Sequence, residues 1–327
     1  MRPRADLQLE TMVSVMKLEG VYTPVITPFR PDRSIDEAAF ERVIEFQIAA
    51  GISGIFVSGT TGESYALNFD ERAHLFGLAK DIIGNRLPMF GGIGAGNTAD
   101  MIALGQAARA AGADGLLMPA PYYACPTENE LARHAIKVDR AVGLPIVLYN
   151  YPGRTGSNMG TTFLNQIRKH KNFCAIKETS GDINRLHTLA LEYNDIQLSC
   201  GMDDQALEFF TWGARSWIAG GGNCLPEEHI ALYRACVVEK DFVKGREIMA
   251  AMMPLMTVLE TGGQFIPCVK YACELAGRPA GTVRPPVSPL GKGLKKKMAE
   301  TIKTLKAAVK AIERKSARKN TGPKKAA

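Results

Sequence analysis

Lys177 is the residue of this sequence whose position most clearly suits covalent chemistry. It closes the apolar run Phe173–Ile176, so we expect its amine to lie in a partly dry pocket. Burial disfavours the ammonium form and lowers the pKa of a lysine from about 10.4 toward neutrality. A neutral amine can attack a carbonyl carbon and form a Schiff base, which then acts as an electron sink. The same position would also suit a structural lysine that pairs with Glu178 or with an acid inside the fold.

A tyrosine occupies the equivalent place in the preceding apolar run. Tyr149 closes Leu144–Tyr149. A phenol there could carry protons to and from the carbinolamine and the carbanion beside an imine carbon. The alternative is a buried aromatic residue whose hydroxyl is hydrogen-bonded within the fold.

Two threonines lie on a turn between glycines, within the segment Gly59–Glu63. The backbone N–H groups of such a turn can face an anion, and the carboxylate of a 2-oxo acid would suit Thr60 and Thr61. Taken alone, the pentapeptide fits a simple loop between a strand and a helix equally well.

Two further residues could bind polar groups of a substrate. Arg154 follows the turn-forming pair Pro152-Gly153 and could hold a second carboxylate bidentately, although a surface arginine would look the same. Thr179 lies two residues beyond Lys177 and points to the same side if the strand continues. It could hydrogen-bond a substrate hydroxyl, or else cap the next helix.

These side chains need a scaffold that brings several strand ends together. Short apolar runs recur along the chain, each followed by helical periodicity, which predicts parallel strands joined by crossover helices. Eight such units favour a closed (β/α)₈ TIM barrel, whose active sites lie at the C-terminal ends of the strands. The runs are Val21–Thr27, Gly54–Ser58, Pro88–Ile93, Gly115–Met118, Leu144–Tyr149, Phe173–Lys177, Ile196–Cys200 and Ser216–Ala219.

The rest of the chain surrounds or follows this barrel. We expect an N-terminal extension over residues 1–17, the barrel over 18–225, a C-terminal helical region over 226–313 and a disordered Lys-rich tail over 314–327. Helical periodicity predicts a helix over Asp36–Ala50, and Thr98 or Asp100 as the cap of another. Further helices are predicted over Pro226–Val238, Phe242–Leu259 and Pro267–Ala276, followed by a final amphipathic segment.

The composition excludes several classes of protein. With 46% hydrophobic residues, the 327-residue chain can build a large core. The longest uncharged run, Phe46–Gly62, has 17 residues with four glycines and falls short of the roughly 20 that a membrane helix needs. Seven cysteines without a C-x-x-C pair argue against a disulfide framework or a zinc cluster and favour a reducing cytoplasm.

The net charge of +7 belongs to the end of the chain. Residues 291–327 hold 13 Lys or Arg against Glu300 and Glu313, a local net of +11 that leaves −4 for the rest. The non-enzymatic alternative is therefore a protein that binds nucleic acid or an acidic surface through this basic tail. The segment Gly92–Gly96 lacks the third glycine of a dinucleotide fingerprint, and no cluster of His and carboxylates predicts a metal.

Four ordered motifs resemble the dihydrodipicolinate synthase/N-acetylneuraminate lyase family of class I Schiff-base enzymes. The resemblance spans roughly Lys17 to Pro289. It implies a TIM barrel with a C-terminal helical extension, assembled as a homotetramer of tight dimers. It also implies a lyase that uses a lysine imine in place of a cofactor or metal. The motifs are GTTGE at Gly59–Glu63, PYY at Pro121–Tyr123, YNYPGRTG at Tyr149–Gly156 and IKETSGD at Ile176–Asp182.

The resemblance also implies a role for each matching residue. Lys177 would form the imine with pyruvate or a related 2-oxo acid, and Tyr149, Thr60 and Tyr123 would form a proton relay. Tyr123 would reach across the dimer interface into the neighbouring site. The residues expected to bind substrate are Thr61 and Gly62 for the 2-oxo acid, Arg154 for the carboxylate of an aldehyde partner, and Thr179 for a hydroxyl.

Departures from the family pattern bear on the second substrate. The Thr60-Thr61 pair resembles the synthases, whereas Thr179 resembles the lyases, and Cys200–Pro226 looks closer to catabolic members. Phe69 or Arg72, together with Gly96, replaces the His and Asn of the lysine-feedback site, so feedback by lysine is not expected. We therefore expect a 4-hydroxy-tetrahydrodipicolinate synthase-like enzyme. The alternative is a catabolic relative such as pyrroline-4-hydroxy-2-carboxylate deaminase, or another 2-oxo acid aldolase or dehydratase.

Overall fold

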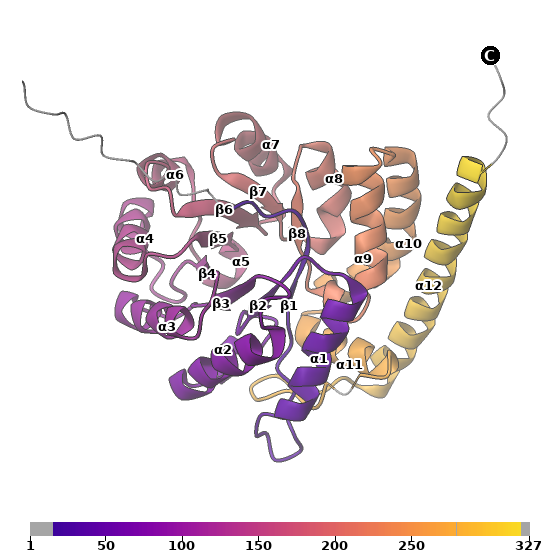
Figure 1. Ribbon diagram of the computed structural model, residues 1–327, viewed down its shortest axis with the longest axis horizontal. Coiled ribbons are helices and arrows are strands. Elements are labelled where there is room, and N and C mark those ends of the chain that lie inside the picture. The colour runs from indigo at the N-terminus through magenta and orange to yellow at the C-terminus, as the bar shows by residue number, and fades with distance from the viewer. Residues whose placement is uncertain (1–15, 279, 322–327) are drawn as a thin grey trace, which may run out of the picture.

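The computed structural model describes residues 16–278 and 280–321. Within them eight parallel strands pair in chain order, and β1 closes the barrel by pairing with β8. Helices surround the strands (Figure 1), which confirms the predicted TIM barrel. The strands are β1 (Gly20–Pro24), β2 (Gly54–Val57), β3 (Met89–Gly92), β4 (Gly115–Pro119), β5 (Ile146–Asn150), β6 (Phe173–Glu178), β7 (Gln197–Cys200) and β8 (Ser216–Ile218).

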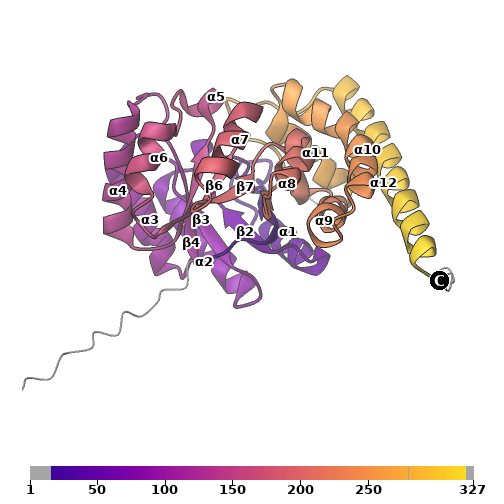
Figure 2. The ribbon, with the colours of Figure 1, turned by 90° about the horizontal axis from the view of Figure 1, so that it is seen from above.

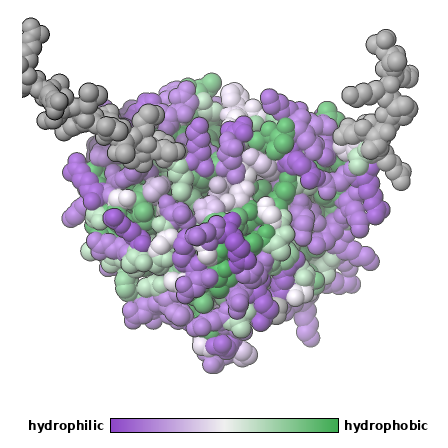
Figure 3. All heavy atoms as spheres, viewed as in Figure 1, coloured by the Kyte–Doolittle hydropathy of each residue, from purple (hydrophilic) through white to green (hydrophobic). Residues whose placement is uncertain are grey.

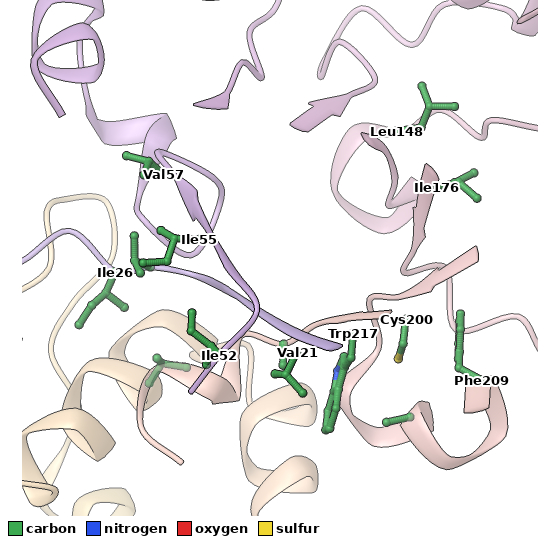
Figure 4. Close-up of a cluster of buried hydrophobic side chains, with 14 of the residues drawn as sticks. Val21, Ile26, Ile52, Ile55, Val57, Leu148, Ile176, Cys200, Phe209 and Trp217 are labelled. Carbon is green, nitrogen blue, oxygen red and sulfur yellow. The ribbon is translucent and has the colours of Figure 1, made fainter. Parts of the chain in front are cut away.

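The strands are apolar on both sides because each one separates two buried layers. Ala175 belongs to the cluster inside the barrel, whereas Ile176 belongs to the larger cluster between strands and helices. Side chains alternate along a strand, so Lys177 faces inward again. Figure 4 shows part of the outer layer, including Leu148, Ile176 and Trp217. Tyr22, Phe56 and Phe90 pack against one another within the barrel.

The crossover helices begin and end at residues with clear local preferences. Asp36 caps the first helix by accepting from the Ala39 N–H at 3.0 Å, and Gly51 ends it in the left-handed region at φ 84°. Asn97 caps the third, so the prediction of Thr98 or Asp100 was wrong: the Asn97 side chain accepts from the Asp100 N–H at 3.0 Å. The helices are α1 (Glu37–Ala50), α2 (Phe69–Ile83), α3 (Thr98–Ala110), α4 (Glu128–Val142), α5 (Pro152–Thr155), α6 (Thr161–Ile167), α7 (Ile183–Glu192) and α8 (Ala206–Thr211).

A group of helices follows β8 and lies against one side of the barrel (Figures 1 and 2). The helix α12 packs along α10 and also contacts α11. Three short 3₁₀ segments follow β2, β7 and β8: η1 (Ser64–Ala66), η2 (Asp203–Gln205) and η3 (Gly221–Asn223). The C-terminal helices are α9 (Pro226–Tyr233), the π-helical turn η4 (Arg234–Val238), α10 (Phe242–Thr261), α11 (Phe265–Leu275) and α12 (Lys292–Thr321).

The boundary predicted at Arg314 does not coincide with the end of an element. The helix α12 continues to Thr321, because the Lys, Arg and Ala residues that mark the basic segment are also strong helix formers. The remainder of the predicted tail, residues 322–327, lies outside the described part, as do residues 1–15 of the predicted N-terminal extension.

Hydrophilic residues cover much of the face seen in Figure 3, with hydrophobic residues in scattered patches. Among the helices of the described chain, none is long and apolar enough to cross a membrane.

Candidate active site

A cavity opens at the C-terminal ends of the strands and brings together residues from distant parts of the sequence. Six of the residues predicted from sequence line it, together with others from the barrel loops and from the C-terminal helices. The predicted ones are Thr60, Thr61, Tyr149, Arg154, Lys177 and Thr179; the others include Tyr151, Gly201, Asp203, Gly220, Glu260 and Phe265.

Tyr149 and Lys177 meet because they are register partners on adjacent parallel strands, β5 and β6. Partners across a parallel pair point to the same side of the sheet, here toward the barrel axis. The Lys177 Nζ lies 4.4 Å from the centroid of the Tyr149 ring. Both side chains are buried, with residue exposures of 6% and 7%. The backbone pairing alone therefore places an amine beside a phenol.

Burial is the main influence on the ionisation of Lys177. Loss of solvent lowers the pKa of this amine to about 8, against the opposing charges of Asp203 and Glu260, and the nearby Arg154 lowers it further. Among the described residues, no carboxylate forms an ion pair with Lys177. Glu178, the partner that a structural lysine could have used, instead accepts from Arg185 Nε at 2.6 Å and from Asn150 Nδ2 at 2.9 Å.

Tyr149 is coupled to the loop that follows β2. Burial raises the pKa of its phenol above the ordinary value, while Arg154 and a hydrogen bond with the Thr60 side chain act in the opposite direction. Tyr149 is thus protonated at neutral pH and has a hydroxyl neighbour, so the pair can pass a proton along the hydrogen bond. Thr61, 7% exposed, lines the cavity beside Thr60.

The loop Gly59–Glu63 is fixed from outside the barrel by α11 and by the segment that follows it. Glu63 has φ 58° and is buried, and its Oε1 lies 2.5 Å from Nζ of Lys270 on α11. The Arg284 N–H donates to its other carboxylate oxygen at 2.9 Å. A buried carboxylate needs such partners to remain charged, so the ion pair holds in place the loop that carries Thr60 and Thr61.

An outer cleft of about 440 Å³ adjoins the inner cavity. Four residues line both spaces: Thr60, Tyr149, Tyr151 and Arg154. Arg154 lies on the short helix α5, and its Cζ stacks 5.3 Å from the centroid of the Tyr151 ring. The guanidinium is exposed and stands at the junction of the two spaces, where it can meet an anionic group that enters from the cleft.

Thr179 follows the last residue of β6 and shares the cavity with Lys177, as its spacing predicted. It is 4% exposed, and its hydroxyl has no hydrogen-bond partner among the described residues. It does not cap the next helix, because Asp182 does so for α7. A buried hydroxyl without a partner is costly, and a substrate group is one means of satisfying it.

Two predicted residues lie elsewhere. Tyr123 is 98% exposed, has φ 70° and lines neither space. Gly62 is also absent from the lining: its carbonyl accepts from Thr27 Oγ1 at 2.7 Å, and a Cβ there would lie 2.9 Å from the Val25 oxygen. Close packing of the loop is the observed role of Gly62. Arg72, considered for a regulatory site, is buried and bonds the Gly92 carbonyl at 2.6 Å.

Several lining residues were not predicted from sequence. Tyr151 lies two positions after Tyr149 in the same motif, and that spacing could have indicated it. Asp203 follows β7, and its two oxygens accept from Trp217 Nε1 and from the Gly221 N–H, both at 2.9 Å. Glu260 comes from α10, far beyond the barrel, and its only signal was one acid at the end of the apolar stretch Ile248–Leu259.

Comparisons of the sequence and of the structure with known proteins place the chain in a family. Residues 17–305 match the model of the dihydrodipicolinate synthetase family. The 4-hydroxy-tetrahydrodipicolinate synthase of Exiguobacterium sibiricum is 35% identical over 89% of this chain and 99% of its own. The synthase structure from Methylacidiphilum fumariolicum SolV superposes with a TM-score of 0.86 at 32% identity, over 91% of this chain and 99% of its own.

A third relative was solved with a ligand. YagE, a prophage protein of the dihydrodipicolinic acid synthase family from E. coli K12, forms a complex with pyruvate. It superposes with a TM-score of 0.83 at 30% identity, over 88% of this chain and 98% of its own.

Proposed function

Because the chain belongs to the dihydrodipicolinate synthetase family, we propose that it condenses pyruvate with an aldehyde to form 4-hydroxy-tetrahydrodipicolinate through an imine on Lys177. The observation that carries this proposal is the buried Lys177 amine beside Tyr149. An amine whose pKa is lowered to about 8 has a substantial neutral fraction near neutral pH and can attack a ketone.

The chemistry of the product identifies the aldehyde. A tetrahydrodipicolinate has a six-membered ring with one nitrogen flanked by two carbons that each bear a carboxylate. Pyruvate supplies one of these carbons, its carboxylate and its methyl carbon, but no nitrogen. The partner must therefore supply an aldehyde carbon, a methylene and a carbon that bears both an amine and the second carboxylate. This compound is 2-amino-4-oxobutanoate.

The lining residues then divide the reaction among them. Lys177 forms the imine, and loss of a methyl proton gives an enamine whose carbon attacks the aldehyde. Tyr149 and Thr60 move protons at the carbinolamine and at the new hydroxyl oxygen, while Thr61 holds the pyruvate carboxylate. Arg154 binds the carboxylate of the amino aldehyde where the inner cavity meets the cleft. The imine is the electron sink, so the proposed reaction needs no further cofactor.

Reductive trapping tests the imine directly. Borohydride added with pyruvate should raise the mass of the intact wild-type protein by one reduced adduct, and the Lys177→Ala variant should not gain it. Lys80→Ala is the matched control, because it removes a lysine that lies outside the cavity and pairs only with the partly exposed Asp114. A wild-type mass unchanged by pyruvate, or an adduct retained without Lys177, would sink the proposal.

Thr179 favours a second candidate function. Its unpartnered hydroxyl in the cavity would suit a substrate that already carries a hydroxyl, such as pyrroline-4-hydroxy-2-carboxylate. The same lysine imine would then support dehydration and deamination. Ammonia released from that substrate in the absence of pyruvate would establish this alternative, and its absence would leave the synthase reaction.

The proposal also covers the cellular location and the assembly of the enzyme. We place it in the cytoplasm, because none of the seven cysteines forms a disulfide among the described residues. We also propose a homotetramer of tight dimers in which Tyr123 completes the proton relay of a neighbouring site, an arrangement that its almost full exposure supports.

A further inference from the structure

Glu260 is an ionisable residue of the cavity to which the proposed reaction gives no role. It lies near the end of α10 and lines the inner cavity together with Lys177 and Arg154. The helix α10 packs against η2, which carries Asp203 and Asp204. A residue of the C-terminal helices therefore faces the amine that the barrel supplies.

Ionisable groups of both signs influence Glu260. Asp203 and Asp204 on η2 disfavour its ionised form, and Lys177 on β6 and Arg154 on α5 favour it. Burial is the largest influence and, with the two acids, raises the pKa of Glu260 to about 8. A carboxyl group with such a pKa can take up and release a proton near neutral pH.

We propose that Glu260 binds the ammonium group of 2-amino-4-oxobutanoate and removes its proton, so that the free amine can close the ring. This inference rests on the synthase function proposed above. Asp203 is a poorer acceptor, because both of its oxygens already accept hydrogen bonds from Trp217 and Gly221. No described residue donates a hydrogen bond to Glu260, and its carboxylate remains free for a ligand.

Ring closure follows once the proton has moved. The amine lone pair attacks the carbon bound to Lys177, and a ring C–N bond forms. A proton then passes from the attacking nitrogen to the Lys177 nitrogen. The lone pair of the ring nitrogen forms a C=N bond to that carbon as the bond between the carbon and Lys177 breaks. The ring nitrogen releases its remaining extra proton to water, and Glu260 returns its proton to Lys177, so electrons, atoms and charge balance.

The cavity provides a second polar group, Thr179, that can bind the substrate ammonium. The buried Thr179 hydroxyl has no partner among the described residues and can accept a hydrogen bond from the same ammonium. Arg154, in the same cavity, binds the adjacent carboxylate. A bound ammonium favours the ionised form of Glu260, so each charged group of the substrate then meets an opposite charge on the protein. An aldehyde without the amine would lack this contact.

Trapping the covalent intermediates tests this role. Borohydride is added to wild type and to Glu260→Gln during turnover of pyruvate and 2-amino-4-oxobutanoate, and intact masses are measured. We expect the variant to accumulate the heavier, condensed but uncyclised adduct on Lys177, with kcat about 10²-fold lower. Glu208→Gln, which removes an exposed acid on neighbouring α8, should behave as wild type.

The outcomes separate this inference from the function on which it rests. If wild type forms no adduct with pyruvate, the synthase proposal itself is wrong. If wild type forms it but Glu260→Gln shows no excess of the heavier adduct, ring closure does not depend on Glu260. Glu260→Asp keeps a proton acceptor and should show an intermediate excess, which provides the test if the Gln variant does not fold.

Discussion

The register between two strands determines that Lys177 and Tyr149 lie side by side. Their Cα atoms are partners across β5 and β6, and the neighbouring pair Asn150 and Glu178 is cross-linked behind them by a hydrogen bond of 2.9 Å. Arg185 adds an ion pair to the same Glu178. The Lys177 amine is therefore held by a rigid strand end and does not depend on a loop.

The lowered pKa of Lys177 predicts how imine formation depends on pH. Only the neutral amine attacks pyruvate, so the rate should rise as pH increases through about 8 and level off above it. Rapid mixing with pyruvate, followed by borohydride quenching at each pH, measures this rate. A midpoint near that of an ordinary lysine, about 10.4, would contradict the burial argument.

Arg154 provides the matched variant for this measurement. Its positive charge lowers the pKa of Lys177, so Arg154→Gln should move the midpoint to higher pH. Imine formation with pyruvate does not require the second carboxylate, so the maximal rate should change little. A midpoint that stays in place, or falls, would show that the two charges do not interact.

Among the individual residues of the site, the sequence indicated those at strand ends. It missed those that reach the cavity only through the packing of distant helices. Lys177, Tyr149 and Thr179 could be predicted because the end of an apolar run fixes both their place and their side of the strand. Glu260 could not, because its place depends on how α10 lies against the barrel, which no local pattern encodes. Gly62, another motif position, packs closely within its loop and does not line the cavity, so its predicted contact with substrate stays a prediction.

The loop after β2 shows how one element depends on another far along the chain. Glu63 at its end forms an ion pair with Lys270 of α11, and Lys270 also donates to the Thr282 carbonyl at 2.6 Å. The Lys270 side chain is 3% exposed and that of Glu63 is fully buried. Removal of one partner from such a pair leaves the other charge buried without compensation.

We therefore expect Lys270→Met to destabilise the fold by about 3–5 kcal/mol, measured as the free energy of unfolding in urea. The double variant Glu63→Gln/Lys270→Met should recover much of the loss, because no unpaired charge remains. Lys80→Met removes a lysine 3.8 Å from the partly exposed Asp114 and should cost at most about 1 kcal/mol. Equal losses for the two lysines would contradict the argument.

Element boundaries followed the sequence wherever local chemistry decides them. Each of the eight apolar runs contains or overlaps a strand, because continuous burial on both faces leaves a clear signal. The structure differs where several residues could serve equally, as at the Asn97 cap. It also differs where one composition fits two states. The Lys-rich end of α12 is typical of a disordered tail, but its residues also favour a helix.

On the scale of the whole molecule, the positive charge is kept away from the reaction. The buried side of α12, which includes Met298, Ile302, Leu305 and Val309, belongs to the same core as α10 and α11. The lysines of α12 thus lie toward its outer side, far along the chain from the two cations of the cavity. The charge of +7 describes this helix more than the catalytic body.

Mixed subunits would test the proposed assembly. We expect Lys177→Ala and Tyr123→Phe each to disable a site. In a mixed dimer, one complete site would form only if Tyr123 acts in the neighbouring subunit. Mixing the two variants under conditions of subunit exchange should restore activity above that of either parent. Activity no higher than the average of the parents would place Tyr123 in its own subunit's site or outside the reaction. Tyr122→Phe mixed with Lys177→Ala provides the matched control.

The helices beyond β8 reach the barrel mouth at two points, through Lys270 and through Glu260. Recombination between relatives is therefore constrained at that junction. A recombination point after β8 would bring in the relative's residues at the positions that face Glu63 and Arg154. Lys177 and Tyr149, which lie on the strands, would be unchanged. New substrate preferences could then arise by exchange of the appended helices, with the covalent chemistry inherited unchanged from the barrel.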